Sequence, residues 1–176
     1  LDVSIPIIME GVIDRPGDVD HYKFQVKSGQ PLAFELRTPN AMHPHFSARL
    51  AVLDAAGEEI LNNFYRKIAG DGNNWIKTLE PKTLYNFEQE GEYYLQIRDL
   101  TSRRGNSKFT YQILVRPQIP HIGEVLAVSL GFRDSRYEED HIILNAGEAK
   151  RLYVTNEKED GYDGEIILSF KNLPPG

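Results

Sequence analysis

Four acidic side chains fall close together around one turn near the start of the chain. Glu10 is followed by Asp14, Asp18 and Asp20, with a proline-glycine pair between the second and the third. Hard cations such as calcium bind several carboxylate and carbonyl oxygens that converge from a turn. The cluster is therefore a candidate calcium site, with Asp18, Asp20, Asp14 and Glu10 as its ligands.

A second interpretation of the same turn needs no cation. The spacing of the acids is not that of an EF-hand loop. The Asp18 carboxylate could instead cap the turn by accepting backbone N–H hydrogen bonds, with Asp20 as a solvated strand residue. We expect this capped turn and no cofactor, with calcium as the alternative.

Aromatic and imidazole side chains supply two further candidates. Trp75 follows a glycine-rich loop and begins an apolar run, so it is a candidate glycan contact on a β-sandwich surface, although burial is the more common fate of such a residue. His43 and His45 lie on the same side of an extended segment. Two imidazoles alone do not make a metal site, so we expect a loop there.

The sequence carries no motif of a familiar catalytic site. It lacks HExxH, the phosphate-binding GxxxxGK and the dinucleotide-binding glycine pattern. Ser129 has neither the leading glycine nor the following helix of a nucleophile elbow. The absence of cysteine excludes thiol nucleophiles, zinc-thiolate sites and disulfides. We expect this chain to be no enzyme and to hold no active site.

Charge and hydropathy restrict the classes of molecule that this chain could bind. The formal net charge is −6, and the lysines and arginines are scattered, which argues against nucleic acid. No apolar run approaches the length of a membrane span, so we expect no membrane insertion. An extracellular protein or a polysaccharide remains as the partner class, and the sequence does not indicate an oligomeric state.

Short β-rich runs separated by turn residues dominate the first two thirds of the chain. No segment shows a clear helical period, so we predict an antiparallel, jelly-roll-like β-sandwich. The predicted strands cover residues 7–13, 19–27, 31–38, 48–54, 59–63, 74–79, 84–89, 92–99 and 108–116. The predicted core consists of Tyr22, Phe24, Leu32, Phe34, Leu36, Leu50, Val52, Leu53, Tyr94, Ile97, Tyr111 and Ile113.

Four motifs in this region carry a family resemblance. They are Pro-Gly-Asp-Val-Asp-His-Tyr-Lys-Phe at 16–24 with Ser-Gly-Gln at 28–30, and the runs 49–58, 90–98 and 108–115. In this order they resemble the bacterial pre-peptidase C-terminal domain over about residues 5–117. That family is a β-sandwich appended to secreted peptidases and other exported proteins. The resemblance implies an accessory module that is secreted, periplasmic or at the cell surface.

A proline-containing connector, Pro117-Gln-Ile-Pro120, predicts a domain boundary. We therefore predict one domain over residues 1–117 and a second over 118–176, with strands at 124–130, 141–144, 150–155 and 165–170. The second part resembles the first half of an immunoglobulin-like repeat of large exported bacterial proteins, and we expect it to be incomplete.

Together these features predict a non-catalytic module for adhesion, substrate presentation or spacing. The alternatives are a carbohydrate-binding module, or a fragment of a serine or metallopeptidase whose catalytic residues lie outside this chain.

Overall fold

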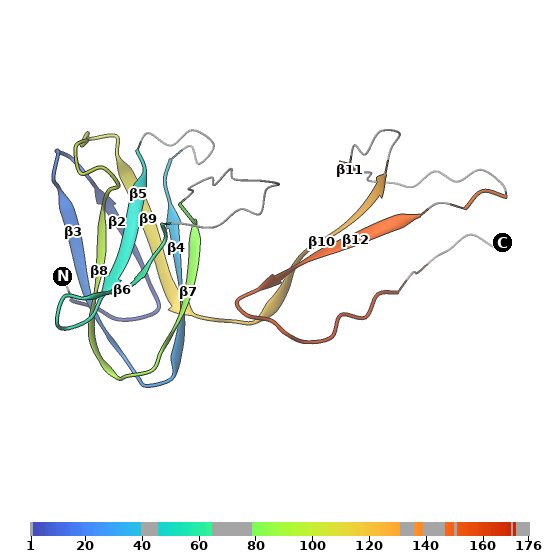
Figure 1. The fold of residues 1–176 in the computed structure, drawn as a ribbon, viewed down its shortest axis with the longest axis horizontal. Coiled ribbons are helices and arrows are strands. Elements are labelled where there is room, and N and C mark those ends of the chain that lie inside the picture. Colours follow the sequence, from blue (N-terminus) through green and yellow to red (C-terminus); the bar gives the residue numbers. More distant parts are fainter. Residues whose placement is uncertain are drawn as a thin grey trace, which may run out of the picture. The chain divides into compact units, whose positions relative to one another are not determined.

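The protein is all-β in the part of the chain that the structure describes. This computed structural model describes residues 2–39, 46–64, 79–130, 136–138, 147–149, 151–169 and 171, which form strands and no helix (Figure 1). None of these residues belongs to an apolar helix that could cross a membrane. The chain divides into two compact units, Leu1–Gln118 and Ile119–Gly176.

The first unit consists of two sheets. The five-stranded sheet has the order β1 (Asp2–Val3), β3 (Val19–Val26), β8 (Gly91–Asp99), β5 (Ala48–Leu53) and β6 (Glu59–Asn62). The four-stranded sheet has the order β2 (Ile7–Val12), β9 (Thr110–Pro117), β4 (Gln30–Arg37) and β7 (Lys82–Phe87). Every neighbouring pair is antiparallel except β1 with β3. The predicted antiparallel β-sandwich is confirmed.

One hydrophobic core fills the space between the sheets. Strands β3, β4, β8 and β9 contribute alternate residues, because successive side chains of a strand point to opposite faces. At its centre the ring of Phe24 lies edge-on to Phe34 and Phe87, at centroid distances of 6.1 and 6.0 Å. Phe46 and Phe109 stack with centroids 4.9 Å apart. Ten of the twelve predicted core residues are buried: Tyr22, Phe24, Leu32, Phe34, Leu36, Leu50, Val52, Ile97, Tyr111 and Ile113.

The core prediction is wrong for Tyr94 and Leu53, which are only half-buried. On β8 the inward set is Tyr93, Leu95 and Ile97, so Tyr94 has the opposite parity and points outward. On β5 the inward set is Ala48, Leu50 and Val52, so Leu53 also has the opposite parity. A one-residue change of parity moves a side chain to the other face of the sheet.

The second unit contains a three-stranded antiparallel sheet in the order β11 (Arg136–Glu138), β10 (His121–Leu130) and β12 (Leu152–Glu159). The prediction of a strand at 165–170 is wrong for residues 165–169. These residues belong to no strand. Ile167 and Leu168 there are 82% and 57% exposed. Apolar residues favour a strand, but a strand forms only where a partner backbone accepts its hydrogen bonds. Residues 141–144 and 74–78 lie outside the described residues.

Candidate functional site

The acidic turn between β2 and β3 is closed by Asp18. Its Oδ2 accepts a hydrogen bond of 3.0 Å from the backbone N–H of Asp14, and its own N–H donates to the carbonyl of Arg15 at 3.1 Å. Gly17 has a φ of +78°, a conformation that glycine adopts without steric cost. This is the arrangement expected of the capped turn.

The Asp20 carboxylate takes part in a different network. It accepts a hydrogen bond from the Tyr111 hydroxyl, which shares a second hydrogen bond of 2.8 Å with the hydroxyl of Tyr22. Tyr22 lies on β3 and Tyr111 on β9, so this network joins the two sheets inside the core. Burial raises the pKa of Tyr111 far above its usual range, and the hydrogen bonds to Asp20 and Tyr22 raise it further. Both hydroxyls therefore stay protonated at neutral pH.

The Tyr111 ring packs directly against the backbone of Gly11. A Cβ added at Gly11 would lie 2.2 Å from the Tyr111 hydroxyl oxygen and 2.4 Å from its Cζ. The tyrosine can cross β2 only because this strand position has no side chain. A glycine inside an apolar strand is the sequence signal that indicates such a close approach.

Glu10 lies on the solvent side of β2, where its carboxylate accepts a hydrogen bond of 2.9 Å from Gln112 Nε2. The carboxylates of Asp18, Asp20 and Glu10 thus accept hydrogen bonds from three different groups. These donors are the Asp14 backbone N–H, the Tyr111 hydroxyl and the Gln112 amide. Within the described residues, no three acidic or imidazole groups are placed to hold a metal ion. Calcium at this turn stays a prediction. The other candidates, Trp75 and the two histidines at 43 and 45, lie outside the described residues.

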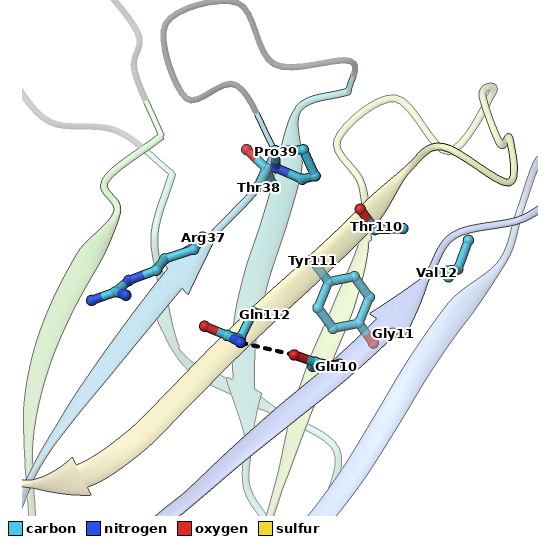
Figure 2. A pocket seen from close by; sticks show the side chains of 9 residues that line it. All are labelled: Glu10, Gly11, Val12, Arg37, Thr38, Pro39, Thr110, Tyr111 and Gln112. Carbon is cyan, nitrogen blue, oxygen red and sulfur yellow. Dashed lines mark hydrogen bonds between the residues drawn. The ribbon is translucent and has the colours of Figure 1, made fainter.

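A pocket of about 520 Å³ opens on the solvent side of the four-stranded sheet, a size typical of small binding sites (Figure 2). In the strand register Gln112 pairs with Glu10 on β2 and with Arg37 on β4, so an acid, an amide and a base form one row. The pocket is lined by Glu10, Gly11, Val12, Arg37, Thr38, Pro39, Thr110, Tyr111 and Gln112.

Apolar side chains adjoin this row. Ile8 and Val12, on the same strand and the same side as Glu10, are 60% and 38% exposed. On the same side of the sheet, Glu35 on β4 and Arg116 on β9 form an ion pair with N–O distances of 2.7 and 2.9 Å, and each side chain is only 18% exposed. We call the surface formed by Ile8, Glu10, Val12, Arg37 and Gln112 the outer sheet face.

Sequence reasoning missed the outer sheet face. Alternation predicts that these residues point outward, but it does not predict that β2, β9 and β4 are neighbours. Only the register of the sheet places Arg37 and Glu10 on either side of Gln112, as Figure 2 shows.

Comparisons with known proteins found likenesses among solved structures alone. No family model matches the chain, and no curated protein matches it. Aeromonas hydrophila PliG, a periplasmic inhibitor of g-type lysozyme, is 17% identical over 67% of this chain and 95% of its own, with a TM-score of 0.48. Salmonella Typhimurium PliG is 16% identical over 66% and 96%, with a TM-score of 0.43.

The pre-peptidase C-terminal domain of Bacillus anthracis collagenase is 14% identical over 65% of this chain and 92% of its own, with a TM-score of 0.45. It is a member of the family that the sequence motifs resemble.

Proposed function

We propose that this chain is a non-catalytic accessory module of an exported bacterial protein, and that its first unit holds a protein partner on the outer sheet face. The observation that carries the proposal is the pocket at Glu10, Gln112 and Arg37 with the exposed apolar residues Ile8 and Val12 beside it. For the second unit, whose sequence resembles an immunoglobulin-like repeat, we propose a role as a spacer.

The chemistry of the outer sheet face supports a protein as the partner. Protein interfaces combine an apolar centre with polar and charged groups at the rim. Here Ile8 and Val12 supply apolar area, while the row of Glu10, Gln112 and Arg37 presents an acceptor, an amide and a cation. Exposed apolar side chains that adjoin a pocket mark binding surfaces more often than isolated ones do.

Contacts within the sheet restrain the side chains of the outer sheet face. Gln112 is held by Glu10, and the paired backbones of β2, β9 and β4 lie beneath both residues. The Glu35–Arg116 ion pair restrains the neighbouring row. Binding to such a surface orders few side chains, which lowers the entropic cost of association.

The test uses two matched variants of the whole chain. Ile8→Arg adds a cation to the outer sheet face, and Ile167→Arg makes the same change at an isoleucine that is 82% exposed in the second unit. A partner is first isolated from the exported proteins of the encoding bacterium and purified. Its dissociation constant is then measured by calorimetry against the chain and both variants.

We expect one-to-one binding that Ile8→Arg weakens at least tenfold, about 1.4 kcal/mol, and that Ile167→Arg leaves unchanged. Circular dichroism must show that both variants remain folded. Equal weakening in the two variants, or no exported partner at all, would refute the binding proposal. Turnover of a peptide or glycan substrate by the purified chain would refute its non-catalytic part.

A further inference from the structure

Two loops at one end of the first unit pack against each other as one surface (Figure 1). They are the β2–β3 loop, residues 13–18, and the β8–β9 loop, residues 100–109. The N–H of Gly17 donates to the carbonyl of Ser102 at 3.0 Å, and the N–H of Asn106 donates to the carbonyl of Ile13 at 2.9 Å. A Cβ at Gly105 would lie 2.0 Å from the carbonyl carbon of Arg15. The two backbones are therefore in direct contact.

Hydrogen bonds from the side chains of Arg98 and Asp99 hold the β8–β9 loop in shape. Asp99 is 1% exposed, and its carboxylate accepts hydrogen bonds from the N–H of Thr101, at 3.1 Å, and from the Thr101 hydroxyl. Arg98 Nη1 donates to the carbonyl of Leu100 at 3.1 Å and to the hydroxyl of Ser102 at 2.8 Å. The loop is thus restrained by hydrogen bonds from the end of β8 and from its own residues.

Four cationic side chains extend from the two loops: Arg15, Arg103, Arg104 and Lys108, all of them exposed. The Arg15 side chain is 79% exposed, and the Arg104 guanidinium lies over the Phe109 ring at 5.2 Å from its centroid. The acids nearest in sequence are Asp14 and Asp18. Asp14 Oδ1 lies 4.0 Å from Arg15 Nε in an exposed ion pair, and Asp18 closes the turn. We call these four cations the basic loop pair. It stands out on a chain whose net charge is −6.

We propose that the basic loop pair binds an anionic polysaccharide. Four cations on preformed loops match a chain of regularly spaced negative charges, and such binding is driven by the release of counterions. The basic loop pair shares no residue with the outer sheet face, so the proposal does not depend on the protein partner. It concerns a second ligand of the same unit.

The positions of the exposed hydrophobic residues favour a polysaccharide over a protein as the ligand of the basic loop pair. The large hydrophobic residues described as exposed are Ile8, Val12, Leu84, Ile119, Ile122, Val125, Tyr153, Ile167 and Leu168. None of them lies in residues 13–18 or 100–109. Protein interfaces depend on buried aromatic or aliphatic anchors, whereas a polyanion needs cations and hydrogen-bond donors. The described side chains of the basic loop pair thus favour the polyanion.

The experiment uses heparin as the probe and the whole chain as the binder, over a series of salt concentrations. Nucleic acids show a slope of roughly 0.7 to 0.9 per phosphate contact in log Kd against log salt. If heparin behaves alike, four cations give a slope of about 3. The double variant Arg103→Gln with Arg104→Gln should weaken heparin binding at least tenfold and reduce the slope by about half. Dextran, which is neutral, should not bind.

A charge-matched control distinguishes an effect of these particular cations from an effect of the change in net charge. Lys27→Gln with Arg151→Gln removes two exposed cations that belong to neither the basic loop pair nor the outer sheet face, and it should change heparin affinity less than threefold. Equal weakening by the two double variants would overturn the proposal. Tighter binding of poly-L-glutamate than of heparin would assign the surface to an acidic protein, and equal binding of single-stranded DNA would show no preference for a polysaccharide. Either result would overturn the proposal.

Discussion

Removal of one hydroxyl group from the centre of the first unit tests the network of two tyrosines and Asp20. Tyr111→Phe keeps the ring and its packing but removes both hydrogen bonds that the hydroxyl makes. We expect the variant to fold, because a phenyl ring occupies the same space. It should be less stable, because Tyr22 and Asp20 each lose a partner in the core.

The magnitude follows from the two bonds. A neutral hydrogen bond contributes about 1 kcal/mol, and one to a charged group about 1.5 to 3 kcal/mol. Asp20 is half-buried, so water can replace part of what its carboxylate loses. We therefore expect Tyr111→Phe to lower the free energy of unfolding by about 2 kcal/mol at pH 7.

The network also predicts the dependence of stability on alkaline pH. The pKa of Tyr111 is raised above the ordinary 10.0, mainly by burial. Below pH 10 the tyrosine is protonated in both states, and its full contribution to stability is present. Above pH 10 the unfolded chain releases this proton while the folded protein keeps it. Stability then falls by about 1.4 kcal/mol per pH unit for this one group.

Urea denaturation followed by circular dichroism measures both effects between pH 7 and 11. The slope above pH 10 should be smaller in Tyr111→Phe by about 1.4 kcal/mol per pH unit. Tyr153→Phe is the control, because Tyr153 is 41% exposed on β12. A loss below 0.5 kcal/mol at pH 7, together with an unchanged alkaline slope, would refute the role assigned to the network.

Four further outcomes are expected. Phe34→Ala removes a side chain with no exposed surface and should lower stability by about 3 to 5 kcal/mol in urea denaturation. Gly105→Ala should force the two loops apart and speed hydrogen exchange at the Asn106 amide; unchanged exchange would contradict the packing. Chelation by EGTA should leave the melting temperature unchanged while Asp18→Ala loses about 1 kcal/mol, whereas a calcium-dependent rise in melting temperature would establish the calcium alternative. Limited proteolysis should cut first within residues 117–123, and a resistant piece over residues 60–170 would contradict that boundary.

Local structure was predictable from the sequence wherever short-range physics decides it. Strand β3 begins at the predicted residue and ends one residue early, because alternation and the flanking glycine turns act over only a few residues. The closure of the acidic turn by Asp18 followed in the same way from its place beside Gly17. The predictions failed at Tyr94 and at residues 165–169, where parity and strand pairing depend on distant partners.

The sites were decided by the tertiary structure. Tyr111 meets Asp20 across 91 positions of the chain, and Gln112 meets Glu10 across 102. Arg15 lies against Gly105 only because the two loops pack together. A side-chain period of two indicates which face of a strand is buried, but it carries no information about which strand lies next to it. That choice is made by the long-range burial of two whole sheets, so the outer sheet face and the basic loop pair exist only in the folded chain.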